Sequence, residues 1–296
     1  MAKLLITGGS GFIGGHLSAI ASSRWEVHVT YHSSRIPVKG PVKAHRLNID
    51  RGEKVENLVD ELFPDVIIHL AAITDSGYCE EIPEEAYWIN TLGTDSLAAA
   101  ADHVEARFIY ASTDMVFKGD RSWYSENDEA DPLSTYGVTK VAGEQVVRKL
   151  VSNHCIARIA LAYGFTLNSS NCFTETMIRE MRQGRAVRLF EDEYRTPIYV
   201  ENLCDVLLEL AERDDLRGIY HIAGPDRLSR SQLGWKVCDL FGFDRDLVVP
   251  VKVDELSLPY PRPKDCSLKN DKANSVLKTP FWSVEDGLKR MKEHAG

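Results

Sequence analysis

The stretch Lys3-Leu4-Leu5-Ile6-Thr7-Gly8-Gly9-Ser10-Gly11-Phe12-Ile13-Gly14-Gly15 decides the fold. A short apolar run leads directly into closely spaced glycines, and an amphipathic segment follows. In such a strand-to-helix turn Gly8 permits the tight bend, Gly11 lets the backbone approach a pyrophosphate, and Gly14 lets the helix pack on the strand. The N–H groups at the helix start can then bind phosphate charge. We therefore expect a dinucleotide phosphate site lined by Gly8, Ser10, Gly11, Phe12, Ile13 and Gly14.

The first half of the chain alternates short β-rich apolar runs with longer amphipathic segments. Strands are predicted at residues 3–7, 26–31, 44–48, 66–70, 107–112 and 155–161. Helices are predicted at residues 13–22, 52–62, 84–103 and 136–152. This alternation is typical of a parallel sheet flanked by helices, so the predicted fold class is α/β, a Rossmann-type doubly wound parallel sheet.

The alternation breaks after about Gly164, where an isolated helix is predicted at residues 173–183. The pattern returns briefly: a strand at 197–200, a helix at 201–213 and a strand at 218–222 suggest a last βαβ-type unit. We therefore divide the chain into a Rossmann domain, residues 1–165 and 196–224, and a smaller discontinuous C-terminal substrate lobe, residues 166–195 and 225–296. The lobe should cover the carboxyl ends of the strands, where open α/β sheets bind ligands.

The composition excludes several classes of protein. The 296 residues carry a formal net charge of −9, and 44% of them are hydrophobic, which is enough for a large core. The surplus of acid disfavours nucleic acids and anionic membranes as partners. The N-terminal apolar stretch is too short for a signal peptide or a membrane span, so we expect a cytoplasmic protein.

The six cysteines are far apart and form no Cys-x-x-Cys pair, so we expect reduced core thiols. No spacing of His, Asp or Glu suggests a metal site, and none is predicted. His69 ends an apolar strand and is interpreted as a core histidine with satisfied hydrogen bonds rather than a ligand.

The end of the second strand bears on the choice of dinucleotide. An NAD site has an acid there for the ribose hydroxyls, but the chain has Val29-Thr30-Tyr31-His32-Ser33-Ser34-Arg35. A 2′-phosphate is therefore tolerated, and Arg35 could pair with it. We expect NADPH as the preferred cofactor, with NADH possible. Asp50, after the third strand, could meet the adenine amino group or cap the next helix.

Tyr136 and Lys140 are one helical turn apart and share a helix face. Hydride transfer to a ketone needs a proton donor for the nascent alkoxide, and a free tyrosine with a pKa near 10 is a poor donor at neutral pH. Lowering that pKa by about three units takes about 4 kcal/mol, the size of one charge interaction at roughly 4 Å. We expect Lys140 and oxidised nicotinamide to supply it, and Thr113, or less favourably Ser112, to hold the substrate oxygen.

These residues carry a family resemblance. The motifs Thr7-Gly8-x-x-Gly11-x-x-Gly14, His69-Leu70-Ala71-Ala72, Ser112-Thr113-Asp114-Met115-Val116-Phe117 and Tyr136-Gly137-x-Thr139-Lys140 resemble the extended short-chain dehydrogenase/reductases. Further segments, at residues 132–137, 195–203, 218–225 and 261–268, resemble the dTDP-4-dehydrorhamnose reductase family. The resemblance implies NAD(P)H-dependent reduction of the C4 ketone of a nucleotide-linked deoxysugar, with Thr113, Tyr136 and Lys140 as the triad. It also places Leu70, Ala71, Ala72, Tyr136 and Lys140 against the cofactor.

For the substrate, we expect contacts from Thr74, Met115, Tyr163, Arg195 and Arg262. A nucleotide sugar carries a diphosphate that needs cations, and the lobe offers Arg179, Arg182, Arg185, Arg195, Arg262 and Lys264. Arg195 and Arg262 are the preferred pair.

The chain departs from the family pattern at two places. It has Gly77-Tyr78 where an aspartate is usual and Leu161 where a tryptophan stacks on the sugar. A different keto-sugar, or a non-sugar carbonyl compound, therefore remains open as substrate.

Two other readings stay open. One is a nucleotide-sugar epimerase or dehydratase with tightly held NAD, against which the missing ribose acid after Tyr31 argues. The other is a non-catalytic NADP-binding subunit that resembles the regulatory β-subunit of methionine adenosyltransferase. The resemblance also makes a homodimer plausible, with residues 84–103 and 136–152 as packing surfaces.

Overall fold

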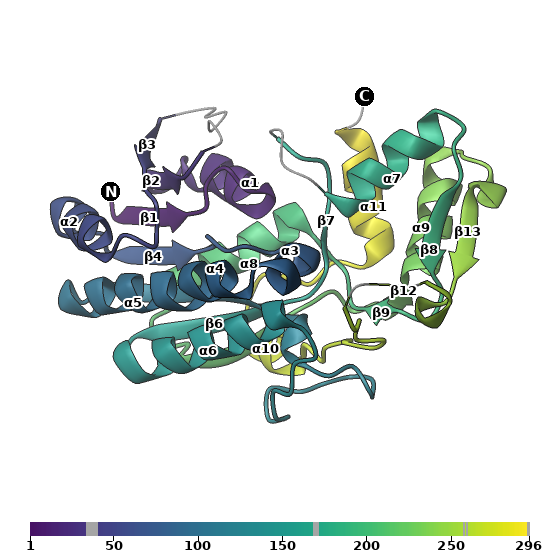
Figure 1. Cartoon of the computed structure of the whole chain (residues 1–296). Helices are drawn as coiled ribbons and strands as arrows, with labels where there is room; N and C mark the ends of the chain where they lie inside the picture. The colour runs from purple at the N-terminus through teal and green to yellow at the C-terminus, as the bar shows by residue number, and fades with distance from the viewer. Residues whose placement is uncertain (34–40, 168–171, 257, 259, 295–296) are drawn as a thin grey trace.

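The computed structural model describes residues 1–33, 41–167, 172–256, 258 and 260–294. Among them, seven parallel strands form a central sheet in the order β3-β2-β1-β4-β5-β6-β11 (Figure 1). The strands are β1 (Lys3–Thr7), β2 (Glu26–Tyr31), β3 (Val42–Arg46), β4 (Val66–His69), β5 (Arg107–Thr113), β6 (His154–Ile159) and β11 (Gly218–Ile222). The strand order reverses between β1 and β4, which is the switch point of a doubly wound sheet. The predicted fold class is confirmed.

Helices cover both faces of the sheet, and successive side chains of a strand point to opposite faces, so each strand contributes to a core on either side. In β1, Leu4 and Ile6 pack on one side with Leu17 of α1 (Phe12–Ala21) and Leu203 of α8 (Val200–Glu212). Leu5 points to the other side. That side is covered by α2 (Gly52–Leu62), α5 (Gly93–His103) and α6 (Thr135–Leu150).

The helix predicted at residues 84–103 is interrupted. It consists of α4 (Pro83–Tyr87), a π-helical turn η1 (Trp88–Leu92) and α5. The turn brings Asn90 fully inside, where its side chain bonds the backbone of Ile73. A short helix α3 (Ser76–Glu81), absent from the prediction, precedes it, and Asp75 caps it by accepting the N–H of Tyr78.

The last βαβ-type unit is corrected by the structure. The strand predicted at 197–200 is β10 (Ile198–Tyr199), which pairs with β7 (Ala162–Tyr163) in a separate two-stranded sheet. Pro197 directly before β10 has no N–H to donate to a ladder, which limits the strand. β11 does join the main sheet, beside β6.

The remaining elements gather mostly at one side of the sheet, where α7, β8, α9 and β13 lie together on the right of Figure 1. β8 (Val187–Phe190) pairs with β13 (Val248–Val251), and β9 (Tyr194–Arg195) pairs with β12 (Leu228–Ser229). The helices are α7 (Phe173–Arg182), α9 (Arg230–Phe241), α10 (Asp271–Val276) and α11 (Val284–Glu293), with short 3-10 turns η2 (Asp114–Val116), η3 (Arg245–Leu247) and η4 (Val253–Glu255).

The cysteines behave as predicted, since all six are buried and free. In the described part of the chain, no group of three or more His, Cys, Asp or Glu side chains is arranged to hold a metal ion. None of the described helices has the length and apolarity needed to cross a membrane.

Candidate active site

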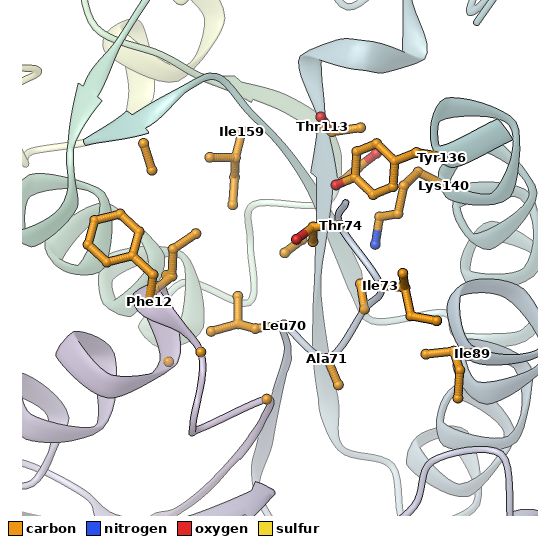
Figure 2. Close-up of a pocket in the computed structure, with 18 of the residues that line it drawn as sticks. Phe12, Leu70, Ala71, Ile73, Thr74, Ile89, Thr113, Tyr136, Lys140 and Ile159 are labelled. Atoms are coloured by element: carbon orange, nitrogen blue, oxygen red, sulfur yellow. The ribbon is translucent and has the colours of Figure 1, made fainter. Parts of the chain in front are cut away.

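A cavity of about 640 Å³ is lined by the segments that follow β1, β4 and β5 and by α6 (Figure 2). Most residues selected from the sequence line it. These are Gly8, Ser10, Gly11, Phe12, Ile13, Gly14, Asp50, Leu70, Ala71, Ala72, Thr74, Thr113, Met115, Tyr136, Lys140 and Arg195. One cavity thus unites the glycine turn with the Thr–Tyr–Lys set.

The glycine turn needs its glycines. Gly8 has φ +72°, and a Cβ there would lie 2.8 Å from the Ala71 nitrogen. A Cβ on Gly14 would lie 2.2 Å from the Gly8 carbonyl oxygen. Gly11 is the N-cap of α1 and has no side chain with which to cap it. The N–H groups of its first turn therefore remain available to a phosphate, so the turn fits a dinucleotide.

The cavity also reaches the end of β2, where Tyr31 and His32 line it, and no acid occurs among the described residues that follow β2 there. Asp50 also lines the cavity, where its carboxylate is 3.2 Å from Arg51 Nε. Asp50 does not cap α2, whose N-cap is Arg51. Arg35 lies outside the described residues.

A buried hydrogen-bond chain supports the cavity floor. The Thr7 hydroxyl accepts the N–H groups of Leu70 and Ala71 and lies 2.7 Å from Nδ1 of His69. Its proton therefore goes to Nδ1, which leaves Nε2–H of His69 to donate to Thr94 at 3.0 Å. Burial, with Lys140 nearby, lowers the pKa of His69 to about 3. His69 is thus a neutral core histidine that fixes the loop after β4, as predicted.

Asn90 ties that loop to the helix of the triad, and sequence reasoning missed it. Its Oδ1 accepts the Ile73 N–H at 2.8 Å, and its Nδ2 lies 2.9 Å from the Ile73 carbonyl and 3.0 Å from Thr139 Oγ1. Thr139 in turn donates to the Tyr136 carbonyl at 2.8 Å. π-helical turns often mark functional sites, but their spacing leaves no periodic signal in a sequence.

The predicted triad meets in the cavity. Figure 2 shows Tyr136 and Lys140 pointing into it from α6, with Thr113 nearby at the end of β5. Ser134 caps α6 by accepting the Gly137 N–H at 3.2 Å, which positions Tyr136 in the first turn. Both Tyr136 and Lys140 are buried.

The electrostatics of the triad differ from the prediction. Burial raises the pKa of Tyr136, the Thr113 hydroxyl opposes that shift, and the nearby Asp114 adds to it. Burial lowers the pKa of Lys140 to about 7, although Glu144 opposes this. The protein groups alone therefore raise the pKa of Tyr136, whereas the sequence predicted that Lys140 and oxidised nicotinamide together lower it.

A buried ion pair lies behind the triad. Glu144, one turn after Lys140, accepts hydrogen bonds from Arg158 at 2.9 and 2.7 Å and from Ser112 at 2.5 Å. The Ser112 hydroxyl is held more tightly than that of Thr113, which donates to Asp114 at 3.2 Å, so Thr113 is the better candidate to hold a substrate oxygen.

Two predicted substrate residues do not line the cavity. Tyr163 is buried beneath α11 and donates its hydroxyl to the Val284 carbonyl at 3.2 Å. Arg262 bonds Glu193 through Nε at 2.8 Å and lies outside the cavity lining. Arg195 does line it, but Asp114 and Glu193 hold its guanidinium at 3.4 and 3.7 Å.

Arg230 is a cavity residue that sequence reasoning missed. It is the first residue of α9, and its Nε donates to Glu193 Oε1 at 2.8 Å. Burial alone would raise the pKa of Glu193, but Arg195, Arg230 and Arg262 together hold it well below its usual range. The sequence gives no spacing signal for this group, because its members lie on separate segments.

Of the two departures from the family pattern, Leu161 lines the cavity and Gly77 does not. Leu161 lines the cavity, where it leaves an apolar wall. Gly77 lies in α3, where an added Cβ would meet Asp75 Oδ1 at 3.2 Å and Tyr260 Cε1 at 3.5 Å.

Comparison with known proteins agrees with this geometry. The Haloferax volcanii protein named "Probable low-salt glycan biosynthesis reductase Agl14" is 31% identical over 289 residues, covering 96% of this chain and 95% of the relative. Methionine adenosyltransferase 2 subunit beta of Xenopus tropicalis is 29% identical, covering 94% and 84%.

Among solved structures, dTDP-4-dehydrorhamnose reductase from Bacillus anthracis in complex with NADP superimposes with a TM-score of 0.85 at 29% identity. The match covers 99% of this chain and 100% of the other. Residues 2–295 match the family described as RmlD substrate binding domain. The chain therefore belongs to the RmlD substrate binding domain family, in agreement with the resemblance of its motifs to the dTDP-4-dehydrorhamnose reductases.

Proposed function

We propose that this protein is an NADPH-preferring carbonyl reductase that reduces a keto group of a nucleotide-linked deoxysugar. The observation that carries the proposal is one cavity lined by both the glycine turn and the residues Thr113, Tyr136 and Lys140. The reductase names of relatives that match nearly the whole chain support it.

The proposed cofactor site consists of the glycine turn, the loop Leu70-Ala71-Ala72 and Asp50, which all line the cavity, with Asp50 assigned to the adenine amino group. The first-turn N–H groups of α1 hold the pyrophosphate. The absence of an acid among the described residues at the end of β2 supports a preference for the 2′-phosphate, and Arg35 is proposed as its cation. NADPH, when bound, would supply the hydride.

The chain's own groups handle the proton. The Thr113 hydroxyl turns its proton from Asp114 to the substrate carbonyl oxygen, and the Tyr136 hydroxyl donates its proton to that oxygen as it becomes an alkoxide. Because burial opposes a phenolate at Tyr136, a protonated Lys140 is needed beside it. Lys140 also holds the nicotinamide ribose.

The substrate lies between the sheet edge and the lobe of residues 166–195 and 225–296. Thr74 and Met115 line its part of the cavity. With Leu161 at the wall in place of a stacking tryptophan, the part of the keto-sugar that faces this wall is apolar.

A second candidate is a non-catalytic NADP-binding subunit, supported by the 29% identity to methionine adenosyltransferase 2 subunit beta. One preparation separates the two functions. NADPH and NADH affinities are measured first, and NADPH oxidation is then followed with keto-sugar nucleotides and simple ketones. Tight NADPH binding with turnover of a keto-sugar nucleotide supports the reductase. NADPH binding without turnover of any carbonyl, and co-purification with a partner, supports the subunit.

We also propose a homodimer that packs through α4, η1 and α6. Tyr87, Trp88, Leu92 and Val138 expose apolar surface there, with exposed fractions of 45, 54, 44 and 53%. The six buried free cysteines support a reducing, cytoplasmic location.

A further inference from the structure

Arg230 is held rigidly at the cavity wall. It follows Ser229, which forms a reciprocal capping box with Gln232 at the start of α9. Its Nε donates to Glu193, and its guanidinium carbon lies 4.8 Å from the centre of the Phe173 ring. A fixed guanidinium loses little side-chain entropy when it binds a ligand.

Arg230 differs from Arg195 and Arg262, the two arginines near it, because it keeps N–H groups without a hydrogen-bond partner among the described residues. Every guanidinium nitrogen of Arg195 has a partner: Asp114 for Nε, the Tyr194 carbonyl for NH1 and the Pro263 carbonyl for NH2. Those of Arg262 are held by Glu193 and the Tyr260 hydroxyl.

Of the three guanidinium nitrogens of Arg230, Nε alone has a hydrogen-bond partner among the described residues. Its NH1 is buried without a partner there. NH2 of Arg230, in contrast, has no hydrogen-bond partner among the described residues and is not buried, so it can donate to an acceptor in the cavity that Arg230 lines.

The charges of the group also favour an anion. Whether or not the buried Asp114 is ionised, three arginines face no more than two carboxylates, which leaves at least one excess positive charge. Of the three arginines, Arg195 and Arg230 line the cavity, and Arg230 retains the free donors. A doubly donating guanidinium matches the oxygens of a phosphate group.

We propose that Arg230 is the residue that binds a phosphate of the substrate, with Glu193 fixing its orientation. The inference rests on the proposed function, because it assumes a nucleotide-linked substrate in this cavity. Asp114 connects the group to the triad, since it pairs with Arg195 and accepts the Thr113 hydroxyl at 3.2 Å. A phosphate on Arg230 therefore fixes the substrate relative to the carbonyl-binding Thr113.

The test uses calorimetric titration of the full chain with dTDP and with inorganic pyrophosphate. NADP⁺ is kept saturating, so that the probes cannot occupy the glycine turn. Arg230→Gln should weaken binding of both probes by at least about tenfold, the loss expected for charge-assisted hydrogen bonds. Arg230→Lys should fall between Arg230→Gln and the wild type. Arg245→Gln, which changes an exposed arginine of η3 that pairs with Asp239, should bind like the wild type.

NADPH affinity and melting temperature report the fold, and both should stay near wild type in Arg230→Lys. Failure of the wild type to bind either probe, or equal binding by Arg230→Gln, overturns the inference. Probe binding that depends on Arg230 supports it even if no carbonyl is turned over, in which case only the proposed reductase fails. Turnover of neutral ketones with a KM insensitive to Arg230→Gln, and no probe binding, leaves the reductase and overturns the inference.

Discussion

The Lys140 ammonium nitrogen lies 4.1 Å from the centre of the Tyr110 ring, and both side chains are buried. No carboxylate of the described residues lies within ion-pair distance of Lys140, because the nearby Glu144 is bonded to Arg158 and Ser112. A ring face attracts a cation less strongly than a carboxylate does, and burial lowers the pKa of Lys140 to about 7. The positive charge of Lys140, which proton donation by Tyr136 requires, is therefore only weakly stabilised.

This relationship predicts a pH-dependent stability. The unfolded chain keeps Lys140 protonated up to its ordinary pKa of 10.5, whereas the folded chain releases the proton near pH 7. Between these values the unfolded state binds more protons, so the Lys140 contribution to stability rises with pH and is least favourable below pH 7. Lys140→Met should therefore stabilise the protein by a few kcal/mol near pH 6, on the order expected for such a shift, and by less near pH 9.5.

Urea unfolding at the two pH values measures the difference. Lys149→Met is the matched control, because Lys149 lies exposed on the same helix. An equal effect of Lys140→Met at both pH values would contradict the assignment of the shift to burial.

Tyr136→Phe tests the proton donor. The ring and its packing are kept and only the hydroxyl is removed, so turnover should fall at least about a hundredfold. The Kd of NADPH should stay nearly unchanged, because no cofactor contact is assigned to the hydroxyl alone. Steady-state kinetics and fluorescence titration measure the two quantities. Turnover near the wild-type value would eliminate Tyr136 as the donor.

The glycine turn can be divided into a structural and a binding glycine. A Cβ on Gly14 would lie 2.2 Å from a backbone oxygen, so Gly14→Ala should destabilise the fold as well as abolish NADPH binding. A Cβ on Gly11 would lie 3.2 Å from the Gly8 carbonyl oxygen, a close contact that is less severe than the one at Gly14. Gly11→Ala should therefore lower the melting temperature less than Gly14→Ala does, but bind NADPH at least about tenfold more weakly, through collision with the pyrophosphate. Normal NADPH affinity in Gly11→Ala would argue that the pyrophosphate lies elsewhere.

The local part of this fold could be predicted because its causes are local. The strand, the glycine turn and α1 follow one another within 20 residues, and each glycine has a steric reason that the sequence already contains. Tyr136 and Lys140 share a helix face by spacing alone. The strand order then brings the segments after β1, β4 and β5 to one edge, so that predictions made separately meet in one cavity.

What escaped prediction depends on contacts between distant segments. The π-helical turn exists where Asn90 bonds Ile73, seventeen positions away, and the helix pattern of residues 84–103 does not reveal it. Glu193 and Arg230 lie 37 positions apart, so their pairing could not be predicted from spacing. The same holds for the hydrogen bond from Arg262 to Glu193. Arg195 and Arg262 remain candidates for the diphosphate only if a ligand replaces these partners.

The proposed dimer makes a specific prediction. Trp88→Lys combined with Val138→Lys puts charge on the apolar surface of η1 and α6, which should convert a dimer into a monomer. Sedimentation velocity at micromolar concentration measures the change. Phe63→Lys is the control, since Phe63 is 64% exposed at the end of α2, away from this surface. A wild-type monomer in the same experiment would rule out the dimer.

The ion pair behind the triad predicts a strongly non-additive pair of substitutions. The side chains of Glu144 and Arg158 are 5% and 4% exposed, so removing one partner leaves the other charge buried without compensation. Glu144→Leu or Arg158→Leu alone should each lower the free energy of unfolding by about 3–5 kcal/mol. The double variant should lose less than the sum, because no isolated charge remains. A double-mutant cycle from urea unfolding measures the coupling, and losses that simply add would mean that the pair contributes no interaction free energy to the fold.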